Sequence, residues 1–145
     1  MPRPTLDETY LQIAEIVAKR ATCPRRQVGC VITDANGRIL STGYNGVAHG
    51  QPHCIDTPCP AALMPSGAAK DLACEAIHAE QNACLFLKEP RQADTIYLTI
   101  SPCITCVKLL LGTAAQRIVL REHHHDSGGA ILWMSAGRQI IRIPA

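Results

Sequence analysis

Two short motifs in the second half of the chain combine side chains that bind transition metals. The first covers residues 78–80 (His-Ala-Glu) and the second covers residues 102–106 (Pro-Cys-Ile-Thr-Cys). Imidazole and thiolate groups are preferred ligands of Zn²⁺, and three protein ligands leave one of its four tetrahedral positions open, whereas a structural zinc is closed by four. We therefore predict a catalytic zinc held by His78, Cys103 and Cys106.

The charge of this ligand set favours a zinc ion that activates water. Two thiolates and a neutral imidazole neutralise Zn²⁺, and a zinc-bound hydroxide leaves one negative charge. Both motifs are expected at helix N-termini, whose dipoles stabilise that charge and keep thiols ionised. Glu80 is two residues from His78 and need not bind the metal. Its expected role is to move a proton from the water to a ring nitrogen, and later to the leaving amine.

Each motif alone is weak, and the combination is specific. A Cys-x-x-Cys pair also occurs in redox proteins and zinc ribbons. His-x-Glu followed by Pro-Cys-x-x-Cys is the signature of zinc-dependent deaminases of cytosine and adenine bases, in which the hydroxide attacks the ring carbon that carries the amine. A redox function would leave His78 and Glu80 without a role. The combination therefore predicts an enzyme, a hydrolytic deaminase.

Hydrophobic periodicity predicts the elements that position these motifs. Thr5 and Glu8 have the spacing of a capping box, and a helix should follow to about Arg20. An Asn-Gly turn between residues 28–33 and 38–42 predicts a β-hairpin. Further helices are expected at 74–88, at 101–111 with Ser101 as N-cap and Pro102 as first residue, and at 131–136, and strands at 95–100, 117–121 and 138–143.

The order of these elements indicates an α/β fold. Strands that alternate with helices favour a mostly parallel sheet covered on both faces, here with an antiparallel hairpin at its start. A chain of 145 residues fits one domain, residues 1–145. Residues 44–73 show no periodicity and include four prolines. A loop of that length in a compact domain needs something that holds it in place.

Composition excludes several classes of protein. With 47% hydrophobic residues and a net charge of +2, the chain is globular and has no polyanion-binding surface. The 3% of aromatic residues argues against a nucleic-acid partner. Apolar runs fall short of the ~20 residues of a membrane span, and no secretory signal is evident, so we expect a cytoplasmic protein without a membrane partner. Its eight cysteines then indicate metal binding more than disulfides.

Several further segments occur in one order along the chain, among them Gln-Val-Gly at 27–29 and Gly-Tyr-Asn-Gly at 43–46. Together they resemble one family, the deoxycytidylate (dCMP) deaminases and their bacterial cytidine/deoxycytidylate deaminase relatives. The combination of Gln-Val-Gly at 27–29 with Gly-Tyr-Asn-Gly at 43–46 is typical of the deoxycytidylate branch. The resemblance covers roughly residues 10–120, and the segments that carry it are 21–32, 43–46, 52–54, 65–67 (Pro-Ser-Gly), 78–83 and 101–110.

The resemblance implies a fold, a reaction and partners. The fold would be the three-layer α/β/α cytidine deaminase-like fold with a mixed five-stranded sheet. The reaction would be the hydrolytic deamination of dCMP to dUMP in pyrimidine nucleotide metabolism. Members often form homo-oligomers, so a hexamer or a dimer is expected, with dCTP as an activator and dTTP as an inhibitor.

The resemblance also implies contacts with the substrate. Asn45 would hydrogen-bond the nucleotide near its sugar, and the backbone N–H of Ala79 would contact the pyrimidine carbonyl. Arg25 and Arg26 offer the donor geometry that suits a 5′-phosphate. Arg26 is preferred because it lies closer to the strand expected to line the site, and a solvated basic stretch is the alternative. The alternative for residues 43–46 is a turn after a strand without a contact to the substrate.

Four cysteines remain for a second metal site. Some members of the resembled family carry a structural zinc whose ligands include cysteines matching Cys23 and Cys54. A closed site of these two with two of Cys59, Cys74 and His53 would explain how residues 44–73 stay ordered. The alternative is four unrelated thiols. The other two cysteines, Cys30 and Cys84, are expected in the core.

The sequence departs from this family in two places. Lys70 stands where relatives often carry a histidine, which removes one expected metal ligand. After Leu120, the run Arg-Glu-His-His-His-Asp replaces an aromatic residue near the substrate ring. A solvated loop is the expected state of His123, His124 and His125, and a regulatory metal or phosphate contact is the alternative.

Two other kinds of function remain open. The substrate of a deaminase could be a tRNA adenosine, a free nucleoside or base, or a pyrimidine of riboflavin synthesis. Scarce aromatic and basic residues argue against a nucleic acid, and residues 43–46 argue against the riboflavin branch. The chain could also be a non-catalytic zinc-binding module, such as a regulatory or DNA-uptake accessory protein. Glu80 argues against that function, since a structural site has no use for a carboxylate beside an open zinc position.

Overall fold

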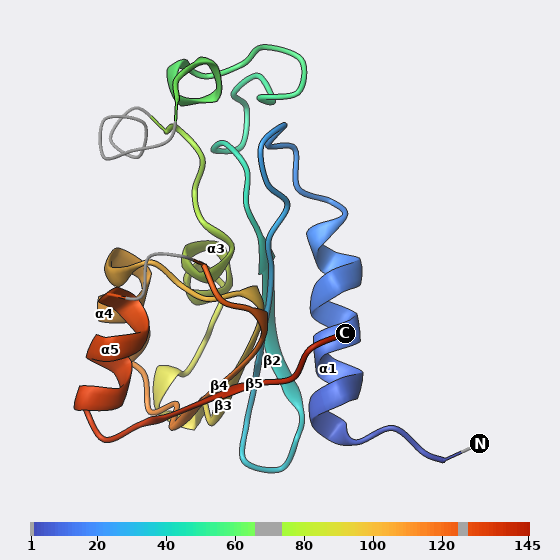
Figure 1. Cartoon of the computed structure of the whole chain (residues 1–145), viewed down its shortest axis with the longest axis vertical. Coiled ribbons are helices and arrows are strands. Elements are labelled where there is room, and N and C mark those ends of the chain that lie inside the picture. The colour runs from blue at the N-terminus through green and yellow to red at the C-terminus, as the bar shows by residue number, and fades with distance from the viewer. Residues whose placement is uncertain (1, 66–73, 125–127) are drawn as a thin grey trace.

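A five-stranded mixed sheet forms the centre of the molecule (Figure 1). Its strand order is β2-β1-β3-β4-β5. Strand β1 (Gly29–Thr33) runs antiparallel to β2 (Ile39–Tyr44) and to β3 (Thr95–Ile100), whereas β3, β4 (Arg117–Glu122) and β5 (Gln139–Arg142) run parallel. The predicted mixed sheet, with a hairpin at its start, is confirmed.

The structure is a computed structural model and describes residues 2–65, 74–124 and 128–145. Four residues singled out by the sequence therefore lie outside the described ranges, namely Ser66, Gly67, Lys70 and His125.

Helices cover both faces of the sheet and complete the predicted three layers (Figure 1). Helix α1 (Leu6–Ala18) packs on one face, and α3 (Ala79–Leu85), α4 (Ile104–Leu111) and α5 (Gly128–Ser135) lie on the other. Among the described helices, none combines the length and the apolar character that a bilayer crossing requires. Two short 3₁₀ helices, η1 (Pro60–Leu63) and η2 (Pro90–Gln92), interrupt the connections.

The two faces of the sheet have separate apolar cores because side chains alternate along each strand. Facing α1, Val31, Tyr97 and Val119 pack with Leu11 and Ala14. The larger core lies under α3, α4 and α5, and includes the fully buried Trp133. Cys30 is buried in this larger core, as expected, and Cys84, which is partly buried, packs against it.

The helix predicted at 74–88 starts too early. Helix α3 begins at Ala79, with His78 as its N-cap. The reason is a long-range pairing: Ile77 N–H donates to Gly46 O at 2.8 Å, and Gly46 N–H donates to Ile77 O at 3.1 Å. Backbone groups bonded to Gly46 cannot take part in a helix, so the chain stays extended up to the metal-binding motif.

The helix predicted from Ser101 also starts later, at Ile104. Ser101 N–H donates to Glu122 O at 2.9 Å, which ties this residue to the end of β4. Cys103 is consequently the N-cap of α4. Each metal-binding motif thus places one ligand at a helix N-cap, a position whose side chain lies beside the unsatisfied N–H groups of the first turn.

Glycines let the helices that carry these motifs approach their supports closely. A Cβ atom on Gly43 of β2 would lie 2.3 Å from Ala79 O and 2.5 Å from Ala83 N of α3. A Cβ atom on Gly129 of α5 would lie 2.4 Å from Pro102 O, just before α4. Backbone therefore rests directly on backbone at both places, and the position of each motif is fixed by the sheet or by α5.

We predict that Gly43→Ala destabilises the protein by about 1–3 kcal/mol, because the methyl group must push α3 away from β2. Thermal unfolding measures the effect. Gly46→Ala is the matched control, since among the described residues a Cβ atom there would meet only Thr22 Oγ1, at 3.5 Å. Equal stability of the two variants would contradict the close packing of α3 on β2.

Candidate metal centre

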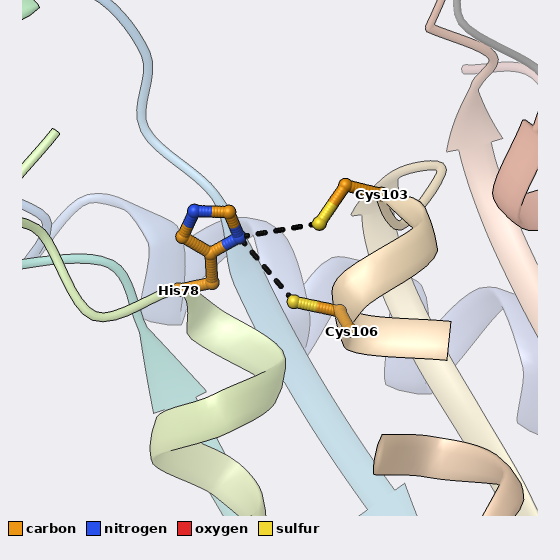
Figure 2. A group of neighbouring side chains, drawn as sticks. All are labelled: His78, Cys103 and Cys106. Carbon is orange, nitrogen blue, oxygen red and sulfur yellow. Dashed lines mark hydrogen bonds between the residues drawn. The ribbon is translucent and has the colours of Figure 1, made fainter. Parts of the chain in front are cut away.

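The three predicted zinc ligands lie together at the start of α3 and α4 (Figure 2). His78 Nδ1 is 3.3 Å from Cys106 Sγ and 3.6 Å from Cys103 Sγ. The three ligand atoms all lie within 4.8 Å of one another, and within the described ranges this is the one group of three or more such side chains that meets this limit. One metal ion could contact all three atoms.

Local hydrogen bonds orient the two motifs. His78 N–H donates to Gln81 Oε1 at 2.8 Å, which closes the first turn of α3. Ser101 is bonded through its backbone to Glu122, and its Oγ accepts a hydrogen bond from His124 N–H at 2.7 Å. The ends of β3 and β4 thereby hold the turn that leads to Cys103. Gln81 is a residue that the sequence analysis missed, although its spacing of three residues from His78 is that of a capping box.

The electrostatics of the two cysteines suit a metal ion. The pKa of Cys103 is lowered to about 4, first by a hydrogen bond from the Cys106 thiol and then by His78, against the effect of burial. The pKa of Cys106 is raised, because its thiol donates to Cys103 and is buried. The pair thus holds one proton, which a metal ion would displace. An imidazole nitrogen and two sulfurs within 4.8 Å of one another fit Zn²⁺.

Glu80 is a buried carboxyl group next to the ligands. It is 4% exposed, and burial raises its pKa. The negative charge of Cys103 adds to this rise, whereas a hydrogen bond with the Cys106 thiol and the charge of His78 oppose it. A carboxyl group whose pKa is raised toward neutral pH can both accept and release a proton. The arrangement can therefore carry out proton transfer beside a metal-bound ligand.

Asn45 directly follows β2, next to the residue pair Gly46 and Ile77 that joins the end of this strand to the segment before His78. Its side chain is 8% exposed and bridges two backbone groups, with Oδ1 accepting from Val28 N–H at 2.8 Å and Nδ2 donating to Arg26 O at 2.9 Å. The segment before β1 is held in place by these bonds. Ala79, whose N–H was expected to contact the substrate, is the fully buried first residue of α3.

The structure separates the two adjacent arginines. The guanidinium group of Arg25 donates to Ala62 O at 3.1 Å and to Met64 O at 2.5 Å, so this residue anchors η1. Arg26 is exposed and lines a cavity at the edge of the sheet. Of the two, Arg26 is the residue placed where it can meet a ligand.

Three of the remaining cysteines lie together near η1, and the charge of a fourth, Cys23, acts on Cys54. Cys54 and Cys59 are buried, and Cys74 packs against them. Burial and the neighbouring charges of Cys59 and Cys23 raise the pKa of Cys54. Although burial opposes it, the pKa of Cys59 is lowered by backbone N–H groups and by the Cys54 thiol. His53, the fifth candidate, has an exposed side chain.

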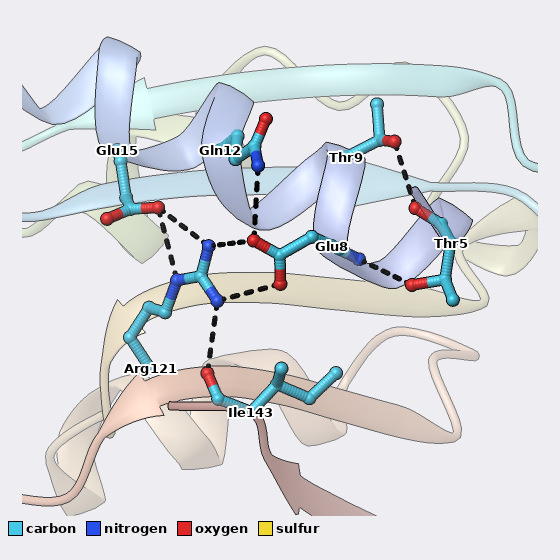
Figure 3. A network of polar contacts seen from close by, with 7 residues as sticks. All are labelled: Thr5, Glu8, Thr9, Gln12, Glu15, Arg121 and Ile143. Atoms are coloured by element: carbon cyan, nitrogen blue, oxygen red, sulfur yellow. Dashed lines mark hydrogen bonds and ion pairs between the residues drawn. The ribbon is translucent and has the colours of Figure 1, made fainter. Parts of the chain in front are cut away.

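Arg121, at the start of the predicted family departure, connects β4 with α1 (Figure 3). Its guanidinium is buried and forms ion pairs with Glu8 at 2.6 Å and Glu15 at 2.9 Å, and it donates to Ile143 O at 3.2 Å. Thr5 caps α1 through Glu8 N–H, as expected, but the Glu8 carboxylate pairs with Arg121 rather than closing the capping box. Arg121 therefore has a structural role. Beyond it, His123 is exposed and His124 is bonded to Ser101.

Comparisons with known proteins agree on one family. The family model described as "Cytidine and deoxycytidylate deaminase zinc-binding region" matches residues 4–122. The chain is 34% identical to the deoxycytidylate deaminase of Schizosaccharomyces pombe, over 95% of this chain and 44% of that protein. It is 37% identical to the deoxycytidylate deaminase of Mycobacterium phage D29, over 82% of this chain and 96% of that protein.

The chain is also similar in fold to a solved enzyme. The crystal structure of dCMP deaminase from the cyanophage S-TIM5, in complex with dCMP and dUMP, superposes with a TM-score of 0.79 at 22% identity, over 99% of this chain and 100% of that one. The likeness confirms the predicted cytidine deaminase-like fold. The chain spans 44% and 39% of the lengths of its relatives from S. pombe and Saccharomyces cerevisiae.

We predict that Cys103→Ala lowers the zinc content by one ion per chain, because two remaining ligands do not hold the metal. Elemental analysis after gel filtration measures the ratio of zinc to protein. Cys84→Ala removes a thiol of the apolar core and serves as the control. Unchanged zinc in Cys103→Ala would exclude this residue from the ligand set.

Proposed function

The chain belongs to the cytidine and deoxycytidylate deaminase family, and from this we propose that it catalyses the zinc-dependent hydrolytic deamination of dCMP to dUMP. The observation that carries the proposal is the convergence of His78, Cys103 and Cys106 next to the buried carboxyl group of Glu80. Three ligands leave a position for water, and Glu80 is the group that can move its protons.

In the proposed reaction, the chain's own residues bind, orient and transfer protons. His78, Cys103 and Cys106 hold the zinc ion, which when bound makes a water molecule acidic enough to ionise near neutral pH. Glu80 takes a proton from the attacking water and delivers one to the ring nitrogen next to C4. The water oxygen bonds to C4, and Glu80 takes the remaining proton of that oxygen and passes it to the amine. The C4–N bond then breaks, ammonia leaves, and the C4–O bond becomes the carbonyl of dUMP.

The proposed substrate contacts come from the same edge of the sheet. Ala79 N–H, in the first turn of α3, would donate to the pyrimidine carbonyl, and Asn45 would bond near the sugar. Arg26 would meet the 5′-phosphate. The choice of dCMP is supported by relatives of this chain named deoxycytidylate deaminase, among them one that it covers almost completely.

The remaining parts of the proposal concern assembly and regulation. We propose a cytoplasmic homo-oligomer, a hexamer or a dimer, that dCTP activates and dTTP inhibits. Exposed apolar side chains support the homo-oligomer because two copies could cover them. They lie at the end of α3 and on α4 and α5, and comprise Leu85, Phe86, Ile104, Leu109, Ile131 and Met134.

Catalysis is tested with the zinc-loaded protein and dCMP, CMP, deoxycytidine and adenosine, by the ultraviolet absorbance change on deamination. We expect dCMP to be deaminated and Glu80→Gln to lose activity by several orders of magnitude while keeping its zinc, since each proton transfer contributes about 100- to 10,000-fold. Glu75→Gln, which changes an exposed carboxylate in the segment before α3, is the control.

The outcomes separate the alternatives. If none of the four compounds loses its amine, the result favours a zinc-binding module over a deaminase of these substrates. Preference for CMP, deoxycytidine or adenosine would identify another substrate with the same chemistry. Retained activity in Glu80→Gln would refute the role of Glu80 as the proton carrier.

A structural zinc between Cys23, Cys54, Cys59 and Cys74 is also part of the proposal. Contact between the thiols of Cys54 and Cys59, the packing of Cys74 and the influence of Cys23 on Cys54 support it. His53 is less suited because its side chain is exposed.

We expect two zinc ions per chain in the wild type and one in Cys54→Ser, together with faster proteolysis near η1, because the metal holds this long connection in place. Zinc analysis and limited proteolysis measure both effects. Cys84→Ser, in the main core, should keep two ions. One zinc per wild-type chain would show that the four thiols bind no second ion.

A further inference from the structure

A cavity of about 430 Å³ lies at the edge of the sheet where β3 and β4 end. Arg26 and Gln27 line it from the segment before β1, and Thr99 and Ile100 line it from the end of β3. Arg142, at the end of β5, lines it from the far side. Its walls therefore come from segments that are distant in the sequence.

This cavity is close to the metal centre. Ile100 is three residues before Cys103, and three residues of chain span at most ~10 Å. The bond from Ser101 N–H to Glu122 O joins the cavity wall to the turn that carries Cys103. A nucleotide whose ring lies at the metal-binding motifs can therefore extend its phosphate toward the cavity.

The charges around the cavity leave two arginines for a ligand. Arg121 forms ion pairs with two carboxylates, those of Glu8 and of Glu15, which also lines the cavity, so it has no unpaired charge to offer a ligand. The other carboxylate side chain in the lining is that of the exposed Glu122, which Arg26 and Arg142 outnumber.

Arg142 is held in a position that suits an oxyanion. Its Nε–H donates to Arg121 O at 3.0 Å, which fixes the guanidinium at the cavity. Because this bond engages Nε, the terminal nitrogens can still form a two-pronged contact with phosphate oxygens. Arg121 in turn is fixed by its ion pairs with α1, so the support of Arg142 is itself rigid.

We propose that Arg142 binds the 5′-phosphate of the nucleotide together with Arg26, and that this contact selects nucleotides over nucleosides. This assignment rests on the proposed function, and it adds a residue that lies outside the segment matched by the family model, residues 4–122. Substrate selection would then depend on β5, which contributes nothing to the metal centre.

The test compares kcat/KM for dCMP and deoxycytidine in the zinc-loaded wild type, Arg142→Gln and Arg142→Lys. We expect Arg142→Gln to lower kcat/KM for dCMP about 10- to 100-fold, mainly through an increase in KM. The value of kcat/KM for deoxycytidine should change by less than about twofold. Arg142→Lys should fall in between, because it keeps the charge and loses the fork. Arg20→Gln, which removes an exposed arginine after α1, is the control.

The proposal is overturned if Arg142→Gln leaves kcat/KM for dCMP unchanged or lowers kcat/KM equally for both substrates. It is also overturned if the wild type has a higher kcat/KM for deoxycytidine than for dCMP. If the wild type deaminates neither compound, the proposed function fails, and titration calorimetry with inorganic phosphate then tests Arg142 separately. A loss of phosphate affinity of at least tenfold in Arg142→Gln would support the contact. Equal affinity, or no phosphate binding in the wild type, would overturn it.

Discussion

The metal centre depends on two helices that begin side by side at one edge of the sheet. His78 and Cys103 are both N-cap residues, and Cys106 lies in the first turn of α4. The N–H groups and the dipoles of these termini favour thiolate over thiol. The distances between the ligands depend on the close packing of α3 on β2 and of α5 on the turn before α4. Gly43 and Gly129 permit this packing because they have no Cβ atom. Backbone packing therefore sets the chemistry of the site.

On the opposite face of the sheet, Arg121 holds α1 against β4. A buried guanidinium is costly unless it is paired, and here two carboxylates of α1 and one carbonyl group satisfy it. Its own carbonyl oxygen accepts the hydrogen bond that fixes Arg142. Arg121, the first residue of the segment where we expected a departure from the family, thus has a structural role, and its carbonyl group also supports one wall of the cavity.

The sequence predicted the strands, and the convergence of His78, Cys103 and Cys106, better than the helix starts. Alternating apolar residues and an Asn-Gly turn are local signals, and so is the spacing of His78, Cys103 and Cys106. The early starts predicted at 74 and 101 were wrong because the bonds of Ile77 with Gly46, and of Ser101 with Glu122, join distant segments. Pairing of Arg121 with α1 spans more than 100 residues and leaves no local pattern either.

Asn45 shows how one side chain can serve both the fold and a ligand. Its amide accepts one hydrogen bond from Val28 and donates one to Arg26, and an asparagine amide has two N–H donors and two lone pairs. Within the part of the chain that the structure describes, one donor and one acceptor site therefore remain, and the proposed nucleotide could use them. Because the two backbone bonds already fix the amide, binding would not have to order it, which lowers the entropic cost of recognition. The same bonds place Arg26, so the sugar and phosphate contacts proposed for this site would be positioned together.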